Sequence, residues 1–158
     1  WHLGDHGMWC KHTNYEQAAR IPVIVAAPDG RKNVATRAMI ETVDLYPTIA
    51  ALAGLAPPAN VDGRDLSAIL SNAEASGRSH VTHVYPRGSR LGRAIRTPRY
   101  RMVQWKSWQK PDSVEYELYD YESDPLETRN LADQQPDVVK RLAKILAEHP
   151  AAMPRVKP

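Results

Sequence analysis

RLGRAIRTPRYRMVQW, residues 90–105, contains two runs that are typical of β-strands, 90–96 and 100–105. The intervening Thr97-Pro98-Arg99 predicts a tight hairpin between them. Two further strand candidates lie outside this pair, at 79–85 and 116–120. The four runs together predict an antiparallel sheet of roughly four strands.

A helix is predicted to follow the sheet, beginning at Pro136. Asp137 lies near the positive end of its dipole, where a carboxylate is stabilising. Apolar residues share one face of this helix at the expected spacing, namely Val138, Leu142, Ile145 and Leu146. Antiparallel strands followed by a helix form a small α+β unit, so residues 78–158 are expected to be a C-terminal α+β subdomain.

The part of the chain before the predicted sheet has a different pattern of apolar residues. The apolar run Ile21–Ala27 does not alternate with polar residues, which predicts a buried strand covered on both faces, as in α/β proteins. A helix capped by Asp44 should follow, with Leu45, Ile49 and Leu52 on one stripe that packs on the sheet, and Gly54 at its end. Shorter helical turns are predicted at 14–20, where Asn14 is the cap, and at 65–70. The polar stretch 71–77 marks a subdomain boundary, so residues 1–77 are expected to belong to an α/β domain.

Composition excludes several classes of function. The chain has 158 residues, of which 42% are apolar and 25% charged, enough for a hydrophobic core. The net charge of +3 comes from scattered Lys and Arg residues, which argues against a nucleic-acid partner. No window is apolar over the roughly 18 residues that a membrane span needs. A single cysteine, Cys10, excludes an internal disulfide and does not decide the cellular compartment. The lack of an initiating methionine indicates a piece of a longer protein.

Several short sequence motifs, here called phrases, follow one another along nearly the whole chain. They are WHLGDHGMWCKHTNYE at 1–16, continuing through Val25, VDLYPT at 43–48, VDGRDL at 61–66, YPR at 85–87, AIRT at 94–97 with Tyr100-Arg101, ELYD at 117–120, Asp124-Pro125 and Asn130-Leu131. Together they resemble the C-terminal third of the type I sulfatases, of the iduronate-2-sulfatase and choline-sulfatase kind, in the alkaline phosphatase superfamily. The resemblance implies an alkaline-phosphatase-like α/β fold in which residues 1–77 end the catalytic domain.

The resemblance also implies a reaction. Type I sulfatases hydrolyse sulfate esters with a formylglycine, a modified Cys or Ser, beside a bound calcium ion. Cys10 is followed by Lys11 and His12, which does not fit the formylglycine motif, so Cys10 is interpreted as a small, partly buried apolar residue and not as the nucleophile. The calcium ligands are expected outside this chain, which should hold no cofactor and be inactive alone.

Three residues of the first phrase are candidate site residues. Lys11 matches the family lysine that contacts the sulfate, where an ammonium can neutralise the non-bridging and leaving oxygens. Trp1 resembles a wall of the substrate pocket, and its alternative is a loop anchor packed in the core. His12 neighbours Lys11 and could contact the substrate, and its alternative is a surface histidine.

Two metal hypotheses arise from the same phrase. Asp5-His6-Gly7 has the residue types of a cation site, but its place in the resemblance is that of a later acidic-His-Gly step and not of the calcium ligands. A zinc site built from His2, Asp5, His6 and His12 is a second possibility, because these side chains bind zinc, although no familiar spacing organises them. The resemblance therefore assigns no metal ligand to this chain.

Alternative functions remain open at this point. A phosphonate or phosphodiester hydrolase of the same superfamily shares the scaffold and the chemistry that the resemblance implies. A noncatalytic binding or assembly module is a different class, in which strand edges of the C-terminal sheet pair with another chain. The expected partners are a sulfate ester substrate and the missing N-terminal part of the sulfatase. For the assembly module, the expected partner is another copy of the chain. Family members are often periplasmic, extracellular or lysosomal, and others are cytoplasmic.

Overall fold

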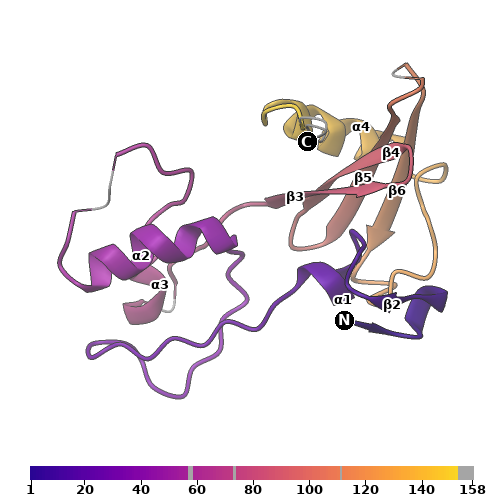
Figure 1. Cartoon of the computed structure of the whole chain (residues 1–158). Coiled ribbons are helices and arrows are strands. Elements are labelled where there is room, and N and C mark those ends of the chain that lie inside the picture. The colour runs from indigo at the N-terminus through magenta and orange to yellow at the C-terminus, as the bar shows by residue number, and fades with distance from the viewer. Residues whose placement is uncertain (57–58, 73, 111, 153–158) are drawn as a thin grey trace. The chain divides into compact units, whose positions relative to one another are not determined.

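The computed structural model describes residues 1–56, 59–72, 74–110 and 112–152 (Figure 1). Contacts divide the chain into two compact units. Unit 1 consists of Trp1–Ile21 together with Thr82–Pro158, and unit 2 consists of Pro22–Val81. Among the described residues, no helix has the length and apolar character needed to cross a membrane.

The centre of unit 1 is a four-stranded antiparallel sheet. Its strands are β3 Val81–Arg87, β4 Arg90–Arg96, β5 Tyr100–Ser107 and β6 Val114–Asp120, in the order β3-β4-β5-β6. In the β4–β5 hairpin the Thr97 amide donates to the Tyr100 carbonyl at 2.8 Å. The predicted sheet and its hairpin are therefore confirmed, and every strand end lies within two residues of the predicted one.

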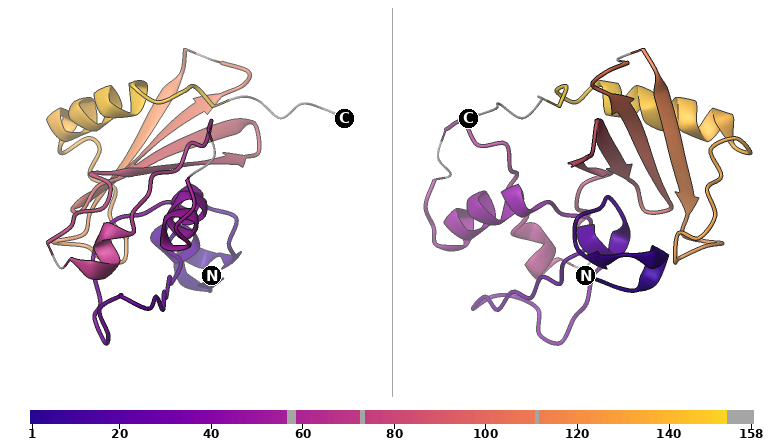
Figure 2. Two further views of the ribbon diagram at one scale, coloured as in Figure 1. Left: turned by 90° about the vertical axis from the view of Figure 1, so that its left-hand side faces the viewer. Right: turned by 45° about the vertical axis from the view of Figure 1, so that its right-hand side comes forward.

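Helix α4, Pro136–Ala147, covers one face of this sheet (Figure 2). Because side chains alternate between the faces of a strand, every second residue of β4, β5 and β6 reaches the helix. The buried cluster between them consists of Ile95, Tyr100, Met102, Leu118, Leu131, Val139, Leu142 and Leu146. The predicted helix is confirmed. Of its four predicted apolar residues, Leu142 and Leu146 belong to the buried cluster, and Val138 and Ile145 pack against it.

The intervening residues of the strands form a second buried cluster, Ala94, Val103 and Trp105, on the opposite face. The N-terminal segment packs here, since the ring centroids of Tyr15 and Tyr119 lie 6.0 Å apart. That segment contains β1 His2–Leu3, the 3-10 turn η1 Asp5–Gly7, β2 Trp9–Cys10 and helix α1 Glu16–Ala19. Tyr15 precedes α1, so Asn14 is not its cap, contrary to the sequence-based expectation.

Unit 2 contains the 3-10 turn η2 Thr42–Asp44 and the helices α2 Leu45–Leu52 and α3 Ala68–Ser71. The buried Asp44 carboxylate accepts hydrogen bonds from the amides of Glu41 and Arg64, both at 2.8 Å, and from Arg78 Nε at 2.7 Å. Asp44 therefore joins three segments of unit 2. Helix α2 and its end at Gly54, which has a positive φ of 70°, are as predicted.

The predicted buried strand at 21–27 is wrong for this chain. Residues 21–27 belong to no strand, and Ile24 is 94% exposed. The predicted packing of α2 on a sheet is also wrong, because Ile49 of its apolar stripe is 62% exposed. A strand needs neighbouring strands for its backbone hydrogen bonds, and no such neighbour lies beside this segment within the described residues. The segment is apolar, as a buried strand would be, but the described residues provide no sheet for it to join.

Candidate functional site

Lys11 and Trp1, the two main candidates, lie side by side on the surface of unit 1. Lys11 follows β2, and its Nζ lies 5.9 Å from the centre of the Trp1 indole. Trp1 is 68% exposed, so it is no core anchor, and its amino group donates to the Gln17 carbonyl at 2.6 Å. An ammonium beside an open aromatic face offers a positive charge and an apolar surface to the same ligand.

The buried His2 side chain stabilises the loop that carries Lys11, residues 2–13. Its Nδ1 pairs with the Asp5 carboxylate and its Nε2 lies 2.7 Å from Thr13 Oγ1. A carboxylate only accepts, so Nδ1 donates its proton to Asp5. The Leu3 amide, 3.0 Å from Asp5, and the His2 ring together hold the pKa of Asp5 below its usual value. The contact between His2 and Thr13 therefore joins the two ends of the 2–13 segment, which carries Lys11.

His12 and Cys10, the neighbours of Lys11 in the chain, are both exposed, which for His12 agrees with its interpretation as a surface histidine. The His12 ring is exposed and lies 6.0 Å from the ring of Tyr85 on β3, so it faces the sheet edge and not Trp1. Cys10 is exposed, which corrects its interpretation as a partly buried residue, and it adopts a positive φ of 70°. The structure thus brings Lys11 and Trp1 together, and it places His12 beside Tyr85.

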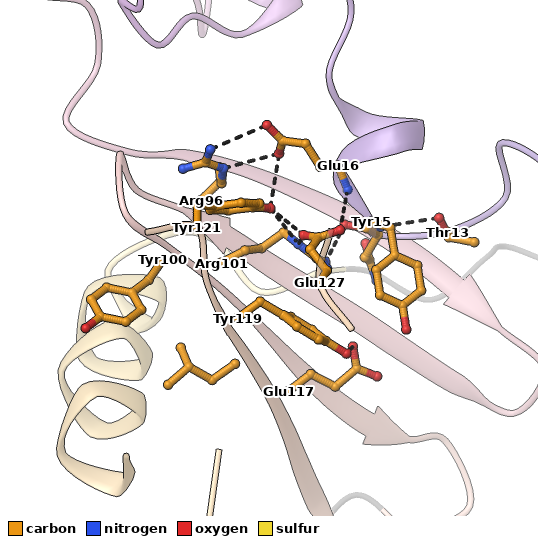
Figure 3. A network of polar contacts seen from close by, with 12 residues as sticks. Thr13, Tyr15, Glu16, Arg96, Tyr100, Arg101, Glu117, Tyr119, Tyr121 and Glu127 are labelled. Carbon is orange, nitrogen blue, oxygen red and sulfur yellow. Dashed lines mark hydrogen bonds and ion pairs between the residues drawn. The ribbon is translucent and has the colours of Figure 1, made fainter. Parts of the chain in front are cut away.

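A buried ion pair lies directly under the same loop (Figure 3). Arg101 Nε pairs with Glu127 Oε1, and Arg101 Nη1 donates to the Asn14 carbonyl. Glu127 Oε2 accepts from the Glu16 amide at 2.9 Å. Two side chains from the sheet and the β6–α4 connection therefore hold the two peptide groups that flank Tyr15.

A second layer of charges surrounds this pair. The Tyr121 hydroxyl lies between the carboxylates of Glu127 and Glu16, as Figure 3 shows. Arg96 Nε donates to Glu16 Oε2 at 3.2 Å, and the Arg96 guanidinium stacks on the Tyr121 ring with 3.7 Å between its Cζ and the ring centre. The two carboxylates and the two guanidinium groups balance, which offsets the cost of burying them.

Burial and charge shift several pKa values in this network. Burial alone would lower the pKa of Arg101, but the carboxylate of Glu127 more than offsets it, so the pKa lies above its usual value. Burial also raises the pKa of Tyr121, which therefore stays a neutral hydrogen-bond donor. His83 on β3 has a pKa below its usual value because it is buried and faces Arg101.

The zinc hypothesis finds no support in this geometry. Both ring nitrogens of His2 are engaged by Asp5 and Thr13, and the His6 ring instead stacks on Tyr15 with 4.1 Å between centroids. Within residues 1–56, 59–72, 74–110 and 112–152, no group of three or more His, Cys, Asp or Glu side chains is arranged to hold a metal ion.

Sequence reasoning missed the residues that support the loop. Arg101 belonged to a quoted phrase, Tyr100-Arg101, but nothing in the phrase indicates that its side chain is buried. Glu127 follows Asp124-Pro125 and was not singled out. The usable signal was the position of Arg101 between Tyr100 and the apolar pair Met102-Val103 in a predicted strand, where a buried charge needs a partner. Of the aromatic residues outside the first phrase, Trp105 is buried, whereas Trp108 and Tyr46 are 40% and 59% exposed.

The antiparallel sheet and its terminal helix are those of the C-terminal region of a sulfatase. The chain belongs to the family described as N-sulphoglucosamine sulphohydrolase, C-terminal, whose family model matches residues 4–152. Its members include sulfuric ester hydrolases, as the names of the relatives show. The resemblance inferred from the sequence phrases is confirmed.

Two relatives illustrate the similarity. Arylsulfatase K of Mus musculus is 30% identical over 146 residues, which cover 87% of this chain and 26% of that protein. Delta 4,5-hexuronate-2-O-sulfatase of Bacteroides thetaiotaomicron is 33% identical over 161 residues, which cover 96% of this chain and 31% of that protein. The chain therefore spans only about a quarter to a third of the length of these relatives.

A solved structure shares the fold. A protein crystallised with its substrate D-glucosamine-2-N,6-O-disulfate aligns with a TM-score of 0.55 and 25% sequence identity. The alignment covers 66% of this chain and 22% of that chain. The predicted fold class, the C-terminal part of an alkaline-phosphatase-like sulfatase with a small α+β unit, is confirmed.

Proposed function

We propose that the complete protein that contains this chain hydrolyses a sulfate ester of a sugar or of another small molecule. The observation that carries the proposal is the 5.9 Å separation of the exposed Lys11 ammonium and the exposed Trp1 indole in a chain of the sulfatase family. A sulfated sugar has an anionic group next to a ring with an apolar face. Lys11 and Trp1 match these two parts.

Each of the three candidate residues has a separate role in this proposal. Lys11 neutralises the charge that develops on the sulfate and on the leaving oxygen, an interaction that is stronger in the transition state than in the ground state. Trp1 packs against the sugar ring and orients it. His12, next to Lys11 and 6.0 Å from the Tyr85 ring, contacts the substrate from the side of the sheet.

The metal and the nucleophile belong elsewhere in the complete protein under this proposal. The sulfatase family suggests a metal-dependent enzyme, and the resemblance implies calcium and a formylglycine. The described residues of this chain do not fit a calcium site, since they present no cluster of three suitable side chains. We therefore assign neither group to this chain and derive no step from them.

The apolar surface of unit 2 supports an N-terminal partner segment. Ile24 belongs to an apolar run that is typical of a buried strand, and Ile49 belongs to the apolar stripe of α2. Yet the two side chains are 94% and 62% exposed. Water contact at such residues is costly, at about 25 cal/mol per Å² of apolar surface. We propose that residues 1–77 complete a catalytic α/β domain whose other strands lie in the preceding part of the protein, and that 78–158 form its C-terminal subdomain.

Assay of the complete protein tests the proposal. We expect turnover of an aryl sulfate and of sulfated monosaccharides, and much slower turnover of a phosphonate monoester. The substitution Lys11→Ala should lower kcat/KM about 100-fold, the usual effect of losing one charge-stabilising group. The control Lys140→Ala removes an exposed lysine of α4 and should change nothing. Unchanged kinetics for Lys11→Ala would remove Lys11 from the site, and preference for the phosphonate would favour the alternative hydrolase.

The noncatalytic alternative predicts a different behaviour of residues 1–158 on their own. The strand edges of the antiparallel sheet in unit 1 would then pair with another copy of the chain. Light scattering distinguishes the two cases, because an assembly module gives one defined oligomer. The sulfatase proposal instead predicts no defined oligomer and no turnover from this chain alone.

A further inference from the structure

We propose that Arg101 and Glu127 are positioning residues for Lys11, acting through the backbone of residues 14–16. This inference rests on the proposed role of Lys11 in sulfate ester hydrolysis. It assigns a function to the buried ion pair, which lies outside the surface that a substrate can reach. The C-terminal subdomain would then contribute to catalysis without contacting the substrate.

The contacts of the pair are directed at the loop backbone. Arg101 Nη1 donates to the Asn14 carbonyl, and Glu127 Oε2 accepts from the Glu16 amide at 2.9 Å. The partners are 87 and 111 residues apart in the sequence, so these are tertiary contacts. Each peptide group next to Tyr15 is therefore held by one fully charged side chain, and charge-assisted hydrogen bonds are the stronger kind.

Burial makes this clamp rigid. The side chains of Arg101 and Glu127 are 1% and 0% exposed, and the ring centres of Tyr15 and Tyr119 each lie 5.0 Å from the guanidinium carbon. Glu127 itself has a φ of 58°, a conformation that is costly for a residue with a side chain. A pair of apolar residues could hold the sheet together at lower cost, but it could not fix the direction of two peptide groups.

The clamp is close enough in the chain to determine where Lys11 lies. Cys10 is held by strand pairing with His2, and Thr13 is held by the His2 ring at 2.7 Å. Only Lys11 and His12 lie between these two fixed points, and Asn14 follows directly. A shift of the Asn14 carbonyl moves the adjacent Thr13, which is one of these two points. It therefore also displaces Lys11, three residues before Asn14. Misplacement of a catalytic group by about 1 Å can cost up to about 100-fold in rate.

A double-mutant cycle in the complete enzyme tests the inference. Arg101→Lys keeps the charge but cannot bind Glu127 and Asn14 with one planar fork. We expect it to lower kcat/KM by roughly tenfold in the presence of Lys11 and by less than about twofold in the Lys11→Ala background, because residues that act through one another are not additive. An activated aryl sulfate keeps the slower variants measurable. The matched control is Arg90→Lys, which alters the exposed pair with Glu115 on the same sheet.

The kinetic outcomes separate positioning from general support. Equal losses in the two backgrounds would mean that Arg101 only stabilises the fold, and this would overturn the inference. No loss from Arg101→Lys would overturn it as well. If Lys11→Ala alone has no effect, the proposed role of Lys11 fails, and with it the catalytic part of this inference.

Amide exchange provides a readout that does not depend on activity. Glu127→Gln has one acceptor oxygen in place of two, so it must lose either Arg101 or the Glu16 amide. We expect faster exchange at residues 11–16 in Glu127→Gln and in Arg101→Lys, and no change in Arg90→Lys. Unchanged exchange at 11–16 in both variants would overturn the clamp itself. Should Glu127→Gln fail to fold, the more conservative Arg101→Lys still decides.

Discussion

Gly92 on β4 lies directly against the side chain of Asn14. A Cβ atom at position 92 would come within 2.4 Å of Asn14 Nδ2 and within 2.7 Å of the Trp105 ring. Asn14 is 3% exposed, and its carbonyl is the group that Arg101 holds. The glycine therefore provides the space in which the segment carrying Lys11 settles on the sheet.

The substitution Gly92→Ala should displace Asn14 and destabilise unit 1. Overpacking of a filled site costs about 1–3 kcal/mol, and both neighbours are themselves buried. Denaturant unfolding measures the loss, and amide exchange at residues 11–16 reports the displacement of the loop. Lys106→Ala, at an exposed position of β5, is the control. A fully stable Gly92→Ala protein with an unchanged loop would contradict the close contact.

Helix α4 should depend on Leu142 for its attachment to the sheet. Leu142 is 2% exposed within the core cluster, and truncation of such a residue costs about 2–5 kcal/mol. We expect Leu142→Ala to lower the free energy of unfolding by this amount in a denaturant titration. Lys140→Ala on the exposed side of the same helix should cost less than about 0.5 kcal/mol. Equal effects of the two substitutions would mean that α4 is not packed on the sheet.

Asp44 should make the stability of unit 2 depend on pH. Burial opposes ionisation of its carboxyl, but Arg78 and the amides of Glu41 and Arg64 outweigh burial and hold its pKa below its usual value. A depressed pKa contributes stability that is present above the unfolded value and is lost as the pH falls through the folded value.

The substitution Asp44→Asn should therefore cost about 2 kcal/mol at neutral pH, since it removes charge-assisted hydrogen bonds. The difference from the parent chain should shrink as the pH falls from 5 toward 2 in a series of urea titrations. Asp29→Asn, at an exposed carboxylate, should leave the curve unchanged. A constant difference over the whole series would show that ionised Asp44 contributes nothing.

His2 should control the order of the Lys11 loop. His2→Ala leaves Asp5 and Thr13 without their ring partner, and loss of buried hydrogen bonds costs about 1–3 kcal/mol. We expect a lower melting temperature and faster amide exchange at residues 10–13. Leu3→Ala, at the neighbouring position of β1, changes a side chain that is 74% exposed and should be close to neutral. If the loop amides exchange at the parent rate in His2→Ala, another contact holds the loop.

Much of the unit 1 scaffold follows from the sequence. The runs 90–96 and 100–105, with the turn between them, predict a hairpin because strand preference and turn chemistry are local properties. The apolar spacing after Pro136 predicts α4 for the same reason. The first phrase also identified the loop that carries Lys11, through its resemblance to sulfatases.

The structure alone revealed which residues hold that loop. Arg101 and Glu127 are 26 residues apart, and their backbone partners lie 87 and 111 residues away. Residue preferences carry no information on such distant contacts, because these arise only when the sheet has folded and its faces are covered. The failed strand at 21–27 has the same cause, since an apolar run becomes a strand only where a neighbour pairs with it. Local periodicity thus determined the elements of this protein, and long-range packing determined which charges were buried and where Lys11 lies.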